Sequence, residues 1–249
     1  MGTTAMIDVT KDNVARYQQP RLFLFRGERQ LLDTLVQPGM RVLDLGCGSG
    51  RVSKYLLRRG ACVLGCDLSR TALRELQENL SAHRDLIISQ GDARQLPFKD
   101  RSFHAVTFTF AGIDYIYPEA DRLGALREIE RVLVPGGGFI FSSHNPLGTL
   151  LSPRGFRSWR GWRWRGQYLV SGAWRKVYFR DYGGILLYQA LPQKVIKQVT
   201  TQTGMQFCLA MSRSGSITSR TMLSIFSAGP YYVFKNDAYA DRQGPLPLF

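Results

Sequence analysis

Short apolar runs alternate with amphipathic stretches along the first 145 residues. Five runs predict buried strands, at 42–45, 61–66, 86–90, 103–110 and 139–142. The stretches between them carry apolar residues at helical spacing and predict helices, at 20–36, 51–59, 69–80 and 121–133. Gly60 follows one of these helices, and Pro135-Gly136-Gly137-Gly138 is expected to end another. Strands that alternate with helices across short turns predict a parallel sheet with helices on both faces.

The alternation stops near residue 145 and resumes with a helix at 193–203, followed by strands at 206–211 and 231–235. Two late strands after one helix favour an antiparallel finish to the sheet. We therefore expect five segments: a helical cap over 1–38, a core over 39–144, an insertion over 145–184, the remainder of the core over 185–236 and a loose tail over 237–249.

A glycine-rich turn, Asp44-Leu45-Gly46-Cys47-Gly48-Ser49-Gly50, follows the first predicted strand. Glycines at a strand-to-helix turn let a ligand approach the backbone, and the helix N-terminus after them favours an anion. The spacing is G-x-G-x-G rather than the G-x-G-x-x-G of dinucleotide enzymes, because Arg51 occupies the place of the third glycine. Taken alone, the segment could also be a tight structural turn.

Two carboxylates follow the next strands. Asp67 ends the second strand, 21 positions after Gly46, and can accept hydrogen bonds from both hydroxyls of a ribose. Asp92 lies just past the third strand and can accept from an adenine amino group. Each residue alone could be a helix cap or a turn residue. Their even placement at successive strand ends favours a nucleotide-like ligand.

Four segments together resemble a known family. VLDLGCGSGR, VLGCDLS, GDARQLPFKDRSFHAV and LREIERVLVPGGGFIFS resemble the successive motifs of class I S-adenosylmethionine-dependent methyltransferases, over roughly residues 37–143. The segments after the fourth and fifth strands resemble the small-molecule type within that superfamily. The resemblance implies an α/β fold with a Rossmann-like, seven-stranded and mostly parallel sheet, its last strand antiparallel, plus an insertion after the fifth strand.

The resemblance also implies a cofactor, S-adenosyl-L-methionine, and residues that bind it. The methionine part would face Asp44 and the turn formed by Gly46, Cys47, Gly48 and Gly50. The nucleoside would contact Asp67, Leu68, Asp92 and Ala93, and the methyl-donor end would contact Phe110, Ala111 and Gly112. Tyr17 or Arg26 of the cap would also contact the cofactor.

A sulfonium methyl donor is already activated, so the protein needs a general base only where the acceptor holds its proton at neutral pH. His144 is a candidate because it follows the fifth strand, at the sheet edge where ligands bind. Asp114, after the fourth strand, is a second candidate. A histidine bonded to a loop carbonyl and a surface turn are the structural alternatives. Neither the Asn/Asp-Pro-Pro-Tyr motif of nucleic-acid amino methylation nor a cytosine-C5 nucleophile is found.

The net charge of +14 is concentrated in one short segment. Residues 145–182 contain eight basic residues and one acidic residue, and all four tryptophans lie between 159 and 174. Three hypotheses remain open for this insertion: a lid over the acceptor pocket, a site for an anionic acceptor or membrane surface, and a surface that binds nucleic acid. A lipid-linked or glycan-linked acceptor fits the second hypothesis.

We expect a cytoplasmic protein, peripheral at a membrane surface at most, since no apolar run reaches the ~20 residues of a membrane span and no signal-peptide pattern is found. The four cysteines lack C-x-x-C spacing, which favours reduced thiols and no metal site. The expected activity is methyl transfer to an oxygen of a small-molecule, glycan or lipid-linked acceptor. An RNA methyltransferase and a non-catalytic cofactor-binding protein are the alternatives.

Overall fold

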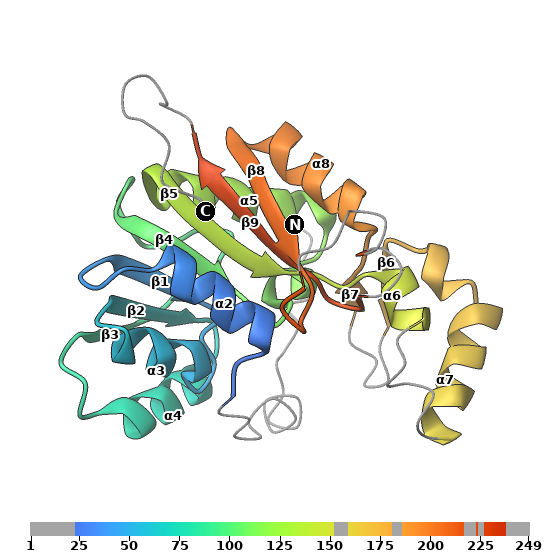
Figure 1. Ribbon diagram of the computed structural model, residues 1–249, viewed down its shortest axis with the longest axis horizontal. Coiled ribbons are helices and arrows are strands. Elements are labelled where there is room, and N and C mark those ends of the chain that lie inside the picture. Colours follow the sequence, from blue (N-terminus) through green and yellow to red (C-terminus); the bar gives the residue numbers. More distant parts are fainter. Residues whose placement is uncertain (1–22, 152–158, 181–185, 217–222, 224–226, 238–249) are drawn as a thin grey trace, which may run out of the picture.

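The computed structural model describes residues 23–151, 159–180, 186–216, 223 and 227–237. Seven strands form one sheet in the order β3-β2-β1-β4-β5-β9-β8 (Figure 1). Their bounds are β1 Arg41–Leu45, β2 Cys62–Asp67, β3 Leu86–Gln90, β4 Phe103–Phe108, β5 Leu133–Ser142, β8 Met205–Met211 and β9 Tyr231–Asn236. Pairs from β3 to β5 are parallel, and β9 runs antiparallel to β5 and β8. The predicted Rossmann-like fold with an antiparallel last strand is confirmed.

Helices cover both faces of this sheet. Their bounds are α2 Arg26–Leu35, α3 Arg51–Arg58, α4 Arg70–Leu80, α5 Glu119–Val132 and α8 Pro192–Gln202. Apolar residues of α2, α3 and α4 pack with one set of strand side chains, and those of α5 and α8 pack with the alternate set. Successive side chains of a strand point to opposite faces, so the central strands β1 and β4 are buried on both sides, whereas the edge strand β3 is partly exposed.

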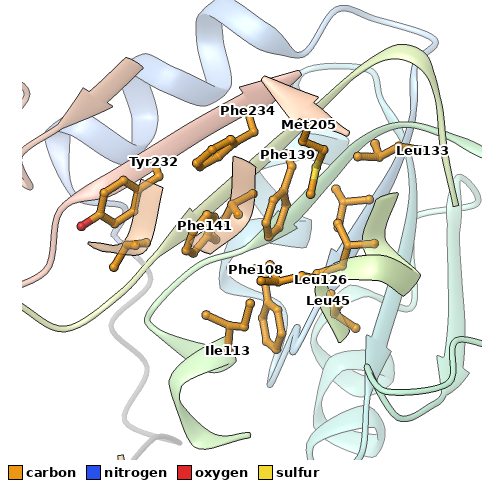
Figure 2. Close-up of a cluster of buried hydrophobic side chains, with 14 of the residues drawn as sticks. Leu45, Phe108, Ile113, Leu126, Leu133, Phe139, Phe141, Met205, Tyr232 and Phe234 are labelled. Atoms are coloured by element: carbon orange, nitrogen blue, oxygen red, sulfur yellow. The ribbon is translucent and has the colours of Figure 1, made fainter. Parts of the chain in front are cut away.

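The core on the α5 and α8 face is rich in aromatic rings (Figure 2). Phe139 and Phe141 are two residues apart on β5 and therefore lie on one face, where their rings stack with centroids 4.7 Å apart. Phe234 and Tyr232 of β9 stack against Phe141 from the neighbouring strand. These contacts hold β9 against β5, and Phe207 of β8 packs edge-on against Phe234 from the other side.

Two predicted strand boundaries are wrong by two residues or more. The strand β5 begins at Leu133, six residues before the predicted start, and includes the Pro-Gly-Gly-Gly segment expected to be a helix stop. The helix before it ends because Leu133 is already extended. The strand β4 ends at Phe108 rather than at residue 110, because Phe110 and Ala111 both have φ of 60°.

The insertion folds into α6 Pro146–Leu151, α7 Trp159–Val170, a short 3₁₀ turn η3 Ala173–Arg175 and a hairpin. The hairpin pairs β6 Tyr178–Arg180 with β7 Leu186–Tyr188 and so crosses the predicted boundary at residue 184. Most of the predicted cap and tail lies outside the described residues. Within those residues, no helix is long and apolar enough to cross a membrane.

Candidate active site

The glycine turn after β1 has space for a side chain at one of its three glycines and none at the other two. Gly46, Gly48 and Gly50 all have positive φ, which favours glycine. A Cβ on Gly46 would lie 2.8 Å from the Phe108 ring, and one on Gly50 would lie 2.4 Å from Leu76. A Cβ on Gly48 would meet nothing within 4 Å. Gly46 and Gly50 thus serve packing, whereas the backbone at Gly48 remains accessible to a ligand. Cys47 between them is buried, and burial raises the pKa of its thiol.

Asp67 holds this turn against β2. The Gly48 amide donates to Asp67 Oδ2 and the Ser69 amide donates to Oδ1, each at 2.9 Å. Ser69 also caps α4, as its sequence position indicates, by accepting from the Ala72 amide. Each carboxylate oxygen retains a lone pair, so Asp67 can still accept from two ligand hydroxyls. Leu68 beside it is 42% exposed.

Asp44 lies beneath the turn rather than at its open side. It is 2% exposed and accepts from Ser53 Oγ at 2.6 Å and from Thr107 Oγ1 at 3.0 Å. Burial raises its pKa to about 6, and the two hydroxyl hydrogen bonds limit that increase. Asp44 therefore joins α3 to β4, and its contact with a cofactor stays a prediction.

Asp92 is paired within the protein. Its two oxygens accept from Arg94, whose Nη2 lies 2.6 Å from Oδ2, and Arg94 also reaches Asp121 at 2.8 Å. Burial opposes the charged form, but the hydrogen bonds from Arg94 lower the pKa of Asp92 below its usual value. The partly buried Ala93 follows it at the same sheet edge. An adenine amino group would share Asp92 with Arg94.

The helix α2 is linked to the glycine turn through a buried ion pair. Glu28 is fully buried and binds both terminal nitrogens of Arg51, at 2.6 and 2.7 Å. Arg51 Nη2 also donates to Thr109 Oγ1 at 3.2 Å. Arg51 thus replaces the third glycine because it connects α2, α3 and the segment after β4. The sequence-predicted contact Arg26 is exposed at the start of α2, and Tyr17 lies outside the described residues.

The segment after β4 has an unusual backbone. Phe110 and Ala111 both adopt φ of 60°, a region that non-glycine residues rarely occupy. The Ala111 amide donates to Ser142 Oγ at 2.8 Å, and a Cβ on Gly112 would lie 2.3 Å from Phe108. Phe110 stacks on Phe25, with ring centroids 6.4 Å apart. Strained backbone of this kind is maintained by its surroundings and is frequent at functional sites.

The two sequence-predicted catalytic candidates are in contact. Asp114 Oδ2 lies 2.9 Å from His144 Nδ1 and accepts from the His144 amide at 2.7 Å. Asp114 Oδ1 accepts from Ser143 Oγ at 2.7 Å. The Asp114 side chain is fully buried, whereas that of His144 is 27% exposed. When Nδ1 carries a proton that it donates to Asp114, Nε2 is left with a free lone pair.

Arg122 of α5 lies beside Asp114 on the buried side of this cluster. It is fully buried, and its Nη2 lies 3.8 Å from Asp114 Oδ1. Its guanidinium carbon lies 3.9 Å from the centroid of the Tyr188 ring. The hydroxyls of Tyr188 and Tyr232 are also buried here, and burial raises the pKa of Tyr188 to about 12. Asp114 is thus compensated by Arg122 and points its second oxygen at His144.

Sequence reasoning missed Glu28 and Arg122, although both carry the same signal. Glu28 lies one turn before Leu31 and Leu32 on the apolar side of α2, and Arg122 lies four residues before Leu126 on the apolar side of α5. A charged residue at a core position of a helix requires a buried partner. Within the described residues, no group of three His, Cys, Asp or Glu side chains could hold a metal ion.

The sheet order, the glycine turn after β1 and the carboxylates after β2 and β3 define the class I S-adenosylmethionine-dependent methyltransferase architecture. Residues 42–137 match the family model described as a methyltransferase domain. Residues 42–137 therefore form a methyltransferase domain of this class, whose cofactor is S-adenosyl-L-methionine.

Curated relatives match this chain only in part. A demethylmenaquinone methyltransferase of Corynebacterium kroppenstedtii is 37% identical over 45% of this chain and 44% of its own length. A fatty-acid O-methyltransferase of Mycolicibacterium smegmatis is 38% identical over 43% of this chain and 38% of its own length. The matched segments thus span less than half the length of these relatives.

Solved structures match much more of the fold. The 1,6-didemethyltoxoflavin-N1-methyltransferase of Burkholderia thailandensis, solved with its acceptor and S-adenosylhomocysteine, has a TM-score of 0.63 at 14% identity. The match covers 91% of this chain and 83% of that one. A methyltransferase of Aquifex aeolicus has a TM-score of 0.60 at 13% identity and covers 90% of this chain and 97% of its own. These likenesses concern the fold alone.

Proposed function

We propose that this protein transfers a methyl group from S-adenosylmethionine to an oxygen of a small amphiphilic acceptor, with His144 as the general base. The observation that carries the proposal is the contact between His144 Nδ1 and the buried Asp114. The contact fixes the partly exposed His144 ring just after β5, at the carboxyl ends of the parallel strands, where ligands of open α/β sheets bind.

The cofactor would supply an electrophilic methyl group on a sulfonium sulfur. Asp67 would accept from the ribose hydroxyls, and the open backbone at Gly48 would allow the cofactor to approach. Asp92 and Ala93 would contact the adenine. Phe110, Ala111 and Gly112 would line the methyl-donor end, between the glycine turn and His144. Leu68, Cys47 and Asp44 would shape the remaining walls.

His144 Nε2 would accept the proton of the acceptor hydroxyl as its oxygen attacks the methyl carbon and the bond from carbon to sulfur breaks. Asp114 would hold the tautomer that leaves Nε2 free and would stabilise the imidazolium that forms. Because Asp114 is fully buried, it would act through His144 and would not contact the acceptor. It is therefore a positioning residue rather than a second base.

Two alternatives have specific tests. An RNA methyltransferase would use the basic insertion, and its RNA affinity would fall steeply between 50 and 200 mM salt, since each neutralised phosphate releases counterions. A non-catalytic protein would bind the cofactor without turnover. The names of the relatives, one acting on demethylmenaquinone and one on fatty acids, support a small amphiphilic acceptor over RNA.

The first experiment is a calorimetric titration with S-adenosylmethionine, followed by an acceptor panel of quinols, fatty acids, hydroxylated lipids and RNA. S-adenosylhomocysteine formation is the readout. The proposal expects micromolar cofactor binding and turnover with an oxygen acceptor that depends on His144. Turnover that is equal in wild type and His144→Ala would refute His144 as the base, and turnover with RNA alone would refute the acceptor class.

A further inference from the structure

The helix α7 in the insertion has an unusual distribution of polar and apolar residues. Two of its described residues are buried. Arg165 Nη2 donates to the Thr149 carbonyl at 3.2 Å, and the Tyr168 ring packs with Phe179 and Leu187 while its hydroxyl is bonded to Gln189. Three large apolar side chains are exposed beside the polar residues Arg163 and Gln167, with Trp162 56% exposed, Leu169 51% and Val170 90%. Helices that pack on a soluble core normally turn such side chains inward.

The three apolar residues lie on one side of the helix. Leu169 and Val170 follow Trp162 by seven and eight positions, which is about two turns. Gly166, midway between them, adds no side chain to this side. The result is an apolar strip of three side chains, interrupted at Gly166, along an outward-facing helix. Figure 1 shows α7 at the outer end of the molecule, beyond α6 and away from the seven-stranded sheet.

Basic residues border the strip. Arg163 is exposed on α7, and Arg175 and Lys176 are exposed in and after η3, within six residues of Val170. The Arg175 guanidinium lies over the Trp174 ring, with 4.7 Å from its carbon to the centroid. The sequence from Arg154 to Arg180 contains no acidic residue. We call Trp162, Arg163, Leu169, Val170, Arg175 and Lys176 the outer face.

We propose that the outer face binds the surface of a membrane that contains anionic phospholipid. Tryptophan is favoured at the headgroup level, and leucine and valine gain by entering the acyl boundary below it. Arginine and lysine beside them meet lipid phosphates and the negative surface potential. RNA would be attracted by the basic residues but would leave Leu169 and Val170 without a partner.

The biological role of this membrane contact, though not the contact itself, rests on the proposed function. Arg165 fixes α7 to Thr149 of α6, and α6 begins two residues after His144. An amphiphilic acceptor taken from the membrane beneath α7 would therefore arrive beside the proposed base. Lipid binding itself is measured without turnover, so a failure of this inference and a failure of the proposed function are distinguishable.

The test is binding of the full chain to vesicles of phosphatidylcholine with 30% phosphatidylglycerol, compared with phosphatidylcholine alone. All four tryptophans lie between 159 and 174, so intrinsic fluorescence reports directly on the insertion. We expect a blue shift with anionic vesicles only, and weaker binding as salt is raised. Binding without a fluorescence shift would place the contact elsewhere and overturn the proposal.

Matched variants assign the contact to the outer face. The triple variant Trp162→Ser, Leu169→Ser, Val170→Ser should weaken vesicle binding at least tenfold. Its control is Ile87→Ser, which replaces an apolar side chain 63% exposed on β3. Arg175→Gln with Lys176→Gln should weaken binding by about fivefold per charge, whereas Arg58→Gln with Arg74→Gln, exposed on α3 and α4, should not.

The outcome that overturns the proposal is specific. Equal losses in the outer-face and control variants, or no binding to anionic vesicles, would exclude a membrane contact at α7. Circular dichroism of each variant checks that the fold is retained. A variant that loses RNA affinity but keeps vesicle binding would assign the outer face to nucleic acid and refute the lipid assignment.

Discussion

The cofactor half and the acceptor half of this molecule are built in different ways. In the cofactor half, the Gly48 amide meets Asp67 at the ends of neighbouring strands, with the carboxylate still partly accessible. In the proposed acceptor half, Asp114 and Arg122 are both fully buried, and His144 is the member of their cluster that is partly exposed. The cofactor half also has a buried ion pair, Glu28 with Arg51, but it presents the backbone of a glycine turn in front of that pair. The proposed acceptor half presents a single side chain that is positioned by buried charges, which are costly and leave little tolerance for change.

His144→Ala tests the acceptor half most directly. If His144 takes the acceptor proton, its loss should lower turnover by about 10²–10⁴-fold while cofactor affinity is retained. Steady-state kinetics and calorimetry measure the two effects separately. The control is His83→Ala, a partly buried histidine outside the cluster. A parallel loss of cofactor affinity would mean that His144 supports the fold of the site rather than the chemistry.

Arg122→Met should give the largest loss of stability. The substitution leaves the Asp114 carboxylate buried without its compensating cation, which costs about 3–5 kcal/mol of unfolding free energy. Arg131→Met, at a more exposed pair with Glu128 and Asp100, should cost about 1 kcal/mol or less. Urea denaturation measures both.

The double variant Arg122→Met, Asp114→Asn sharpens the same comparison. Removing both charges should recover much of the stability lost in Arg122→Met, because no unpaired ion remains. Turnover should stay low, since an amide cannot stabilise the imidazolium. Recovery of turnover together with stability would contradict the positioning role of Asp114.

Asp44 should make the stability of the cofactor half depend on pH. Its pKa is raised to about 6 in the folded protein from an ordinary value near 3.8, because burial disfavours the carboxylate. Stability from this group is therefore present below about pH 4 and is lost as pH rises through 6. Relative to Asp44→Asn, wild type should lose about 2 kcal/mol between pH 4 and 7.

Asp92 provides the control of opposite sign. Its pKa is lowered in the folded protein, since the hydrogen bonds from Arg94 outweigh burial. Its contribution to stability is thus present above the unfolded pKa and is lost as pH falls through the folded value. Urea midpoints of Asp92→Asn should approach those of wild type in acid. If the difference in stability between wild type and Asp44→Asn had the same pH dependence as that for Asp92→Asn, the prediction of a raised Asp44 pKa would be wrong.

Asp67→Ala should have the smallest effect. Loss of an acceptor for two hydroxyls should weaken S-adenosylmethionine binding by about 1–3 kcal/mol. The exposed Asp85→Ala, just before β3, should leave the affinity unchanged. Calorimetric titration measures both, and unchanged affinity in Asp67→Ala would remove the ribose assignment.

The two halves also differ in how far their sequence predicts them. The sequence predicts the strand ends at Asp67, at Asp92 and at the glycine turn, because each is marked by residues next to a strand in the chain. His144 and Asp114 were predicted separately, but their contact depends on how β4 and β5 pair. Arg122 was missed because helical periodicity predicts which side of a helix is buried but does not indicate that a charged residue on that side has a buried partner. The start of β5 was missed because a glycine run favours a turn until a neighbouring strand pairs with it.

The position of β9 has a consequence for protein synthesis. The ribosome completes β5 and β8 before residues 231–236, yet β9 lies between those two strands in the finished sheet. Until it arrives, β5 lacks its neighbour on that side and β8 has no partner strand among the described elements. Both expose unpaired backbone groups, the kind of edge that recruits other chains. Until residues 231–236 can pair, the nascent polypeptide therefore exposes two strand edges that favour aggregation.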